Sequence, residues 1–172
     1  MDAMGWDKGI DYEFYRGWFE RNLKHTRSDK RYAYTSILYT QLLNGSRISE
    51  AVRAMIEFVR TGGREVRVKL SKRRREDYRL IIIPEIIDRG RCIQICDVGE
   101  GKLINRVKTF CRSKYHVNTH SLRYAFITHL LRQNVNPSII AKITKHSRLD
   151  LILTYTQEKE AEKILREEVE YG

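Results

Sequence analysis

Patterns typical of β-strands occur in only one part of this sequence, residues 56–84, and this restriction limits the possible folds more than any other feature. Residues 56–59, Ile-Glu-Phe-Val, are a short strand candidate, residues 66–70 alternate between apolar and polar side chains, and residues 80–84 form an apolar run. A Thr-Gly-Gly turn signal separates the first two segments, and a run of charged residues separates the last two. The stretch therefore predicts three short strands in a small antiparallel sheet with one basic hairpin.

Helical patterning dominates the rest of the chain. Apolar side chains recur there at the three- and four-residue spacing of amphipathic helices. The segments are residues 10–23, 34–42, 46–55, 103–114 and 119–132, followed by helix starts at Pro137 and Ser147 and a Glu-rich helix over residues 158–171. A length of 172 residues is enough for one domain with a hydrophobic core. The predicted fold class is mainly α with a small three-stranded antiparallel sheet, an α+β arrangement.

The charge of the chain is strongly basic and unevenly distributed. There are 33 Lys and Arg residues against 22 Asp and Glu, which gives a formal net charge of +11. Residues 60–79 hold nine Lys and Arg against three Asp and Glu, a local +6, whereas residues 157–172 hold three against six, a local −3. A basic body with a dense basic segment is typical of a protein that binds a polyanion, and nucleic acid is the first candidate.

Cysteine content and apolar run length argue against several other classes. The three cysteines form no Cys-x-x-Cys pair, which speaks against a disulfide framework and against a zinc site, so no metal is expected. The sequence contains no signal peptide and no apolar run of membrane-spanning length. We therefore expect a cytoplasmic protein without a membrane partner.

Three cationic side chains lie where two helices are predicted to begin. Arg47 follows Gly45 by two residues, and His120 and Arg123 lie near the start of the helix over residues 119–132. The helix dipole makes cations unfavourable at these positions. A phosphate between the two helix starts would explain them, because free backbone N–H groups and guanidinium groups both bind phosphate oxygens. The alternative is that each arginine pairs with a surface carboxylate.

A second pair of candidate residues lies in the segment KHSRLDLILTYTQ. His146 precedes the helix that begins at Ser147, and Tyr155 follows His146 by nine residues, near the predicted end of that short helix. A phenol is a weak nucleophile, but neighbouring cations favour its phenolate form and also bind the group that it attacks. The alternative interpretation is a half-buried tyrosine and a histidine that caps a helix.

Four of these sequence features occur in an order that resembles a known family. GSRISE, a basic β-hairpin, HSLR and KHSRLDLILTY follow one another as in the catalytic domain of tyrosine recombinases, the phage-integrase family. The resemblance covers residues 31–157. It implies an N-terminal helix and linker over residues 1–30 and a catalytic domain with an acidic C-terminal helix over residues 31–172. Full-length relatives usually carry an N-terminal DNA-binding domain, and the sequence leaves open whether such a domain was removed.

The resemblance also implies roles for individual residues. Arg47 and Arg123 would clamp the scissile phosphate, and His120 and His146 would hydrogen-bond its oxygens and assist proton transfer. Tyr155 would attack the phosphorus and form a 3′-phosphotyrosyl link with release of a 5′-hydroxyl. The chemistry needs neither a metal, nor ATP, nor another cofactor.

The resemblance places a general acid in the basic hairpin, and two lysines are available there. Lys72 fits the position at the hairpin tip better than Lys69, so Lys72 is predicted to protonate the leaving 5′-oxygen and Lys69 to contact DNA. Arg73, Arg74 and Arg75 follow directly and are predicted to contact the phosphate backbone beside the cleavage site. A solvated turn is the alternative for these three arginines.

Two positions depart from the family pattern. Lys145 replaces the usual glycine before the second histidine, and Tyr124 occupies a position where histidine is common. Neither departure removes a catalytic group.

The predicted function is a site-specific recombinase or integrase that is associated with the nucleoid, binds double-stranded DNA and self-associates on it as a dimer or tetramer. Two alternatives stay open. One is relaxation of DNA as in type IB topoisomerases, and the other is a non-catalytic DNA-binding protein on a recombinase scaffold.

Overall fold

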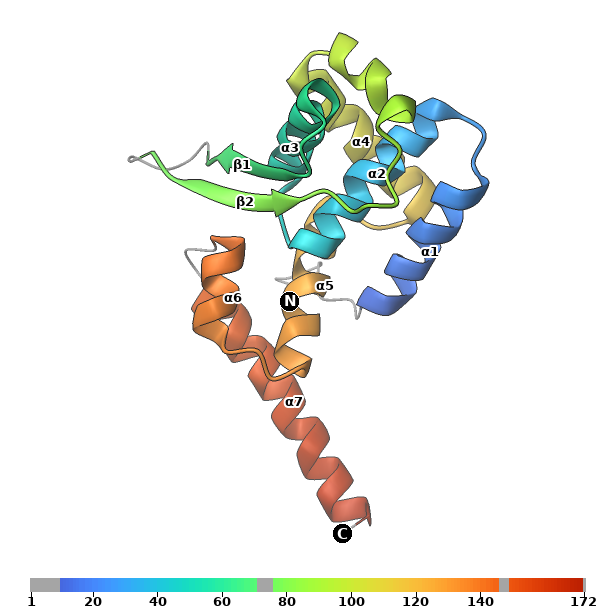
Figure 1. The fold of residues 1–172 in the computed structure, drawn as a ribbon. Coiled ribbons are helices and arrows are strands. Elements are labelled where there is room, and N and C mark those ends of the chain that lie inside the picture. The colour runs from blue at the N-terminus through green and yellow to red at the C-terminus, as the bar shows by residue number, and fades with distance from the viewer. Residues whose placement is uncertain (1–9, 71–75, 146–148, 172) are drawn as a thin grey trace.

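The computed structural model describes residues 10–70, 76–145 and 149–171; in the last segment, side chains are described from residue 157 onward, with 159 and 171 excepted (Figure 1). The order of elements is α1 (Tyr12–His25), α2 (Asp29–Asn44), α3 (Ile48–Thr61), β1 (Glu65–Lys69), β2 (Tyr78–Ile82), the 3₁₀ helix η1 (Arg89–Asp97), α4 (Glu100–Tyr115), α5 (Thr119–Arg132), α6 (Pro137–Thr144) and α7 (Leu149–Tyr171). This order confirms the prediction of a mainly helical fold with one small sheet.

Helix α2 forms the centre of the fold. All side chains over residues 32–42 are buried, and Ile37, Leu38 and Leu42 are fully inaccessible to solvent. A helix that is buried on all sides must be enclosed by other elements, and α2 packs against α1, α3, α4, α5 and η1 (Figure 1). Phe19 of α1 belongs to the same core. The predicted boundary between an N-terminal segment and the catalytic domain at residue 30 stays a prediction.

The prediction of three strands was wrong. Residues 56–59, expected to form the first strand, lie in the second half of α3, where Val52, Met55, Phe58 and Val59 share its buried face. The spacing of these four residues by three and four is helical, and residues 56–59 resemble a strand only when they are considered without the preceding turns. Within the described residues the sheet has two antiparallel strands, in which Val66 of β1 pairs with Ile81 of β2.

The C-terminal region also differs from the prediction of two helices. A single 23-residue helix, α7, runs from Leu149 to Tyr171 and includes the position of Tyr155, which was expected near the end of a shorter helix. Figure 1 shows this helix extending away from the body of the molecule. Its apolar residues Ile164, Leu165 and Val169 are 51%, 64% and 75% exposed. None of the described helices combines the length and the apolar character that crossing a membrane requires.

Gly45 ends α2 and brings that end close to α5. Its φ of 60° lies in the left-handed region, which is the usual conformation of a glycine that terminates a helix. A Cβ atom at this position would lie 2.1 Å from Cδ1 of Phe126 in α5. Backbone conformation and packing therefore both require glycine here, two residues before Arg47.

We expect Gly45→Ala to lower the free energy of unfolding by at least about 2 kcal/mol. The left-handed conformation costs a residue with a Cβ about 1–2 kcal/mol, and overpacking against Phe126 adds about 1–3 kcal/mol. Gly62→Ala is the matched control, because Gly62 also has a positive φ, yet its Cβ would meet only the end of the flexible Arg89 side chain, at 3.0 Å. Urea denaturation measures both losses, and equal losses would contradict a packing constraint at Gly45.

Candidate active site

Arg47 is the residue at which α3 begins. It occupies the N-cap position with extended backbone, and its N–H donates to Oε1 of Glu50 at 3.1 Å. The Nη1 atom of Arg47 lies 3.7 Å from Oε2 of the same carboxylate. An acidic residue in the first turn is favourable because it faces the positive end of the helix dipole. Glu50 therefore holds both the backbone and the side chain of Arg47.

Gln41 joins the starting points of α3 and α5. Its Nε2 donates to the carbonyl oxygen of Ser46, at 3.1 Å, and to that of Thr119, at 3.0 Å. Buried polar groups need such partners, so this side chain fixes the two helix starts next to each other. The predicted convergence of these two helix starts is therefore a feature of the fold.

Arg123 lies in the second turn of α5 and is only 2% exposed. Its Nη2 donates to the carbonyl oxygen of Thr144 at the end of α6, at 3.3 Å. Its Nη1 lies 4.0 Å from Oε1 of Glu50 and has no hydrogen-bond partner among the described residues. Burial, followed by the positive charge of Arg47, lowers the pKa of Arg123 to about 10. A bound anion would therefore stabilise the positive charge of Arg123.

Arg79 is a third arginine at the same place, and the sequence interpretation missed it. It lies on β2 and is 2% exposed; its Nη2 donates to the Asn44 carbonyl oxygen at 2.6 Å, and its Nη1 lies 3.4 Å from the Gly45 carbonyl oxygen. Nη1 is also 3.5 Å from Oε1 of Glu50. Burial lowers the pKa of Arg79. The two-residue period of the strand carried this signal, because Arg79 and Ile81 are two residues apart and share the buried face of β2.

Glu50 is the centre of this cluster. Arg47, Arg79 and Arg123 each form an ion pair with it, and within the described part of the chain these are the only ion pairs that the three arginines make. Three guanidinium groups against one carboxylate leave an excess of two positive charges. Buried charge of one sign is costly unless a partner compensates it. A tetrahedral oxyanion such as a phosphate would supply that partner and would accept a hydrogen bond from Nη1 of Arg123, which makes none to the described residues.

The alternative proposed for the arginines was pairing with surface carboxylates. The structure shows instead a single carboxylate, Glu50, whose side chain is 3% exposed. All three arginines therefore converge on one buried carboxylate, and none of them pairs with a separate carboxylate at the surface among the described residues.

The predicted site residue His120, and Lys145 at the position of the family's glycine, each directly follow a residue whose carbonyl oxygen accepts a hydrogen bond at this cluster, Thr119 and Thr144. His120 is exposed in the first turn of α5, one residue after Thr119. Lys145 follows α6 with a φ of 56°, the left-handed conformation that accounts for glycine at this position in the family pattern, and its Nζ lies 3.4 Å from Oδ1 of Asp77. The second box of the family pattern therefore follows directly on the carbonyl oxygen that Arg123 contacts.

The hairpin is described only in part. Nζ of Lys69 lies 3.1 Å from Oε1 of Glu76 on the solvent side of the hairpin, and hydrogen bonding to this carboxylate raises the pKa of Lys69. Lys72, Arg73, Arg74, Arg75 and His146 lie outside the described residues, and the side chain of Tyr155 does as well. Their predicted roles, and the choice between Lys72 and Lys69, stay predictions.

No group of three or more His, Cys, Asp and Glu side chains lies within reach of a common metal ion in residues 10–70, 76–145 and the described part of α7. The cysteines are unpaired thiols: Cys92 and Cys111 are buried, and Cys96 is half-buried.

The sequence is similar to several known proteins, although no family model matches it. The chain is 37% identical over 170 residues to "Putative integrase ORF241" of Acidianus two-tailed virus, an alignment that covers 94% of this chain and 68% of that protein. It is 25% identical over 99 residues to tyrosine recombinase XerC of Natranaerobius thermophilus, which covers half of this chain and a third of that protein.

A comparison of structures finds the same kind of protein. The crystal structure of XerA recombinase superposes with a TM-score of 0.50 at 17% sequence identity, over 86% of this chain and 59% of that chain. At this identity the similarity concerns the fold alone, and the chain spans less than two thirds of the XerA chain. The similarity in sequence to the viral integrase agrees with the motifs, and the similarity to XerA agrees with the mainly helical fold. The chain belongs to the tyrosine recombinase/integrase family.

Proposed function

We propose that this protein is a site-specific DNA recombinase that cleaves and rejoins DNA strands through a 3′-phosphotyrosyl intermediate. One observation carries the proposal: Arg47, Arg79 and Arg123 surround Glu50 with a net positive charge, and the buried Nη1 of Arg123 has no hydrogen-bond partner among the described residues. Guanidinium groups bind phosphate oxygens in a bidentate manner. A phosphodiester of DNA is the anion that a member of this family would bring to such a cluster.

In the proposed reaction, Arg47 and Arg123 bind the non-bridging oxygens of the scissile phosphate. His120, at the start of α5, and His146 hydrogen-bond the same group and assist proton transfer. The phenolic oxygen of Tyr155 forms a bond to phosphorus while the bond to the 5′-oxygen breaks, and Lys72 donates a proton to that oxygen. Lys69 is the alternative acid, although its pairing with Glu76 directs it toward the solvent side of the hairpin.

The energetics require neither a nucleotide nor a metal. The ester bond to Tyr155 preserves the free energy of the phosphodiester, so a 5′-hydroxyl from the same or another strand can reverse the step. Charge that develops on the phosphate is stabilised by cations held in place before the reaction, which is usually the largest contribution to catalysis of this kind. Arg79 would contribute by holding Glu50 and the Gly45 carbonyl in position.

The proposed partner is double-stranded DNA, bound through the basic hairpin and the arginine cluster. Copies of this chain would associate on that DNA as a dimer or tetramer. The high net charge of +11 supports a polyanionic partner. Association with the nucleoid follows from DNA binding.

Covalent trapping tests the proposal. We expect a covalent protein–DNA product that withstands SDS when the protein is incubated with nicked duplexes that carry candidate target sites. The product should form in EDTA and without ATP. It should accumulate because the short 5′-hydroxyl strand is released after cleavage and religation is then prevented. A denaturing gel measures the adduct. Relaxation of supercoiled plasmid without exchange between duplexes would indicate topoisomerase activity instead. DNA binding without any adduct on these duplexes or on plasmid would contradict catalysis and favour the non-catalytic alternative.

A further inference from the structure

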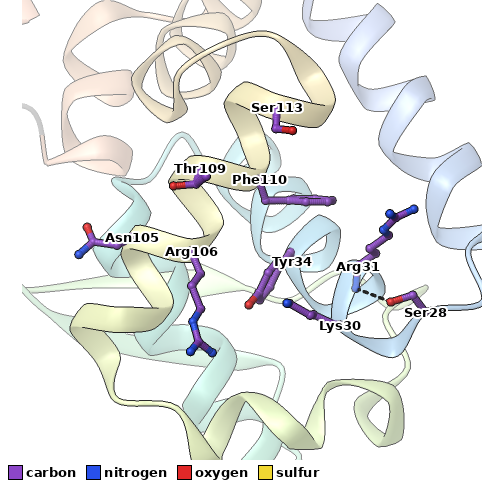
Figure 2. A pocket seen from close by; sticks show the side chains of 9 residues that line it. All are labelled: Ser28, Lys30, Arg31, Tyr34, Asn105, Arg106, Thr109, Phe110 and Ser113. Carbon is purple, nitrogen blue, oxygen red and sulfur yellow. Dashed lines mark hydrogen bonds between the residues drawn. The ribbon is translucent and has the colours of Figure 1, made fainter.

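A groove lies between the first half of α2 and α4, away from the arginine cluster. Its main part is a hollow of about 630 Å³, which Lys30, Arg31 and Arg106 line together with the aromatic side chains of Tyr34 and Phe110 (Figure 2). A second hollow of about 220 Å³ shares Arg31 and Phe110 with the first and extends the groove toward the end of α1.

The groove is lined by cations, and none of the described residues that line either hollow is an Asp or a Glu. The acidic residues at the starts of the two helices are engaged elsewhere: Oδ1 of Asp29 lies 2.8 Å from Nε of Arg91, and Oε1 of Glu100 lies 2.7 Å from Nε of Arg53. The four cations of the groove form no ion pair with any described residue; they are Lys30, Arg31, Arg106 and Lys114. Their charge is therefore available to an anion.

The surfaces between these cations suit an extended anion better than a small one. The ring centroids of Tyr34 and Phe110 lie 5.5 Å apart in an edge-to-face arrangement, and Nζ of Lys30 lies 6.0 Å from the centroid of the Tyr34 ring. Figure 2 shows Lys30 and Arg106 reaching from α2 and α4 into the same space. Asn105, Thr109 and Ser113 add hydrogen-bonding groups along α4, and such side chains commonly contact phosphate and sugar in nucleic-acid complexes.

The groove is separated from the candidate active site by the length of α2. That helix has 16 residues, which corresponds to about 24 Å at a rise of 1.5 Å per residue. Lys30 and Arg31 lie at its beginning, whereas Gly45 and Arg47 follow its end. None of the three clustered arginines lines the groove. A phosphate bound here is therefore distinct from the scissile phosphate.

The basic surface extends along α4 beyond the groove, because Lys102 and Arg112 of that helix are also exposed.

We infer that this groove binds the phosphodiester backbone of a second segment of duplex DNA, separate from the segment at the arginine cluster. The inference goes beyond the proposed strand cleavage and rests on it only for the choice of duplex DNA as the nucleic acid. One subunit would thereby hold two DNA segments at once. The acidic helix α7 of another copy is the competing occupant, because it carries six Glu against three Lys and Arg over residues 157–172.

The test is a charge-neutralised variant, Lys30→Gln with Arg106→Gln, compared with Arg21→Gln with Arg132→Gln. The control pair removes the same charge from exposed positions on α1 and α5 that line neither hollow. Binding of a short duplex is measured over a range of salt concentrations, and a second labelled duplex is titrated onto protein that is already saturated with the first. Adduct formation on a minimal nicked duplex is measured in parallel.

We expect the groove variant to lose capture of the second duplex by at least roughly tenfold and to shallow the salt slope of that step by up to about 2 units, since each phosphate contact contributes about 0.9. The control variant should retain both, and adduct yield on the minimal duplex should be unchanged in each. The salt slope is readable even if wild-type protein forms no adduct, so the two proposals fail separately. Three results would each overturn the inference. The groove and control variants could capture the second duplex equally well, or the groove variant could lose adduct on the minimal duplex to the same extent. The groove variant could also lose self-association while its capture of the second duplex is unchanged.

Discussion

Tyr155→Phe is expected to abolish the covalent protein–DNA adduct, a decrease of at least roughly 10³-fold, while DNA affinity changes little. The substitution removes only the phenolic oxygen, which is the atom proposed to attack the phosphorus. The arginine cluster and the basic hairpin are untouched, so the positive charge that binds the phosphate backbone remains. A denaturing gel with a nicked duplex measures the adduct, and a gel-shift assay measures binding.

Tyr171→Phe provides the matched control, because both tyrosines lie within α7. The control should form the adduct at the wild-type level. A normal adduct yield from Tyr155→Phe would show that another residue is the nucleophile. Loss of adduct from both variants would point to a general disturbance of the helix.

Glu50→Gln should lower the free energy of unfolding by about 3–5 kcal/mol, the range for removing one partner of a buried ion pair. Glutamine has nearly the same shape as glutamate but no charge. Its introduction would leave Arg79 and Arg123, each only 2% exposed, without any ion pair among the described residues. It would also remove the charge that holds Arg47 at the start of α3. We therefore expect reduced adduct formation even at temperatures where the variant is folded.

Glu57→Gln is the control for this prediction, because Glu57 lies on the same helix but is exposed, and no ion pair of its side chain is described. Its stability should change by no more than about 0.5 kcal/mol, as is usual for a surface substitution. Urea denaturation at neutral pH measures both variants, with the m-value as a check that the unfolding transition is comparable. Similar stability of Glu50→Gln and wild type would contradict the view that Glu50 is the counter-ion of three arginines.

Local chemistry made several elements predictable from the sequence. Asn118 and Asn136 cap α5 and α6 with side-chain oxygens that accept backbone N–H groups, and each stands directly before an apolar helical pattern. Arg47 was recognisable as a residue of interest because it stands at a helix start, where a cation is unfavourable. These inferences depended only on residues within one or two turns of each other.

Other features could not be predicted because the deciding interactions join distant parts of the chain. The mostly apolar residues 56–59 suit either a strand or a helix, and packing of α3 against α2 and η1 favours the helix. The side chain of Arg79 is buried because the hairpin register turns it toward the end of α2. Nothing in the immediate neighbours of Arg79 indicates carbonyl partners at positions 44 and 45.

The sequence by itself determined the mainly helical character, the helix starts that carry Arg47 and Arg123, and the motifs that resemble tyrosine recombinases, because each follows from residue type and short-range spacing. Only the tertiary structure decided that Glu50 collects three arginines, that Gln41 joins the starts of α3 and α5, and that α2 separates a second basic groove from this cluster. Burial and hydrogen bonding between residues far apart in the chain depend on how the helices pack, and that packing is a property of the whole core.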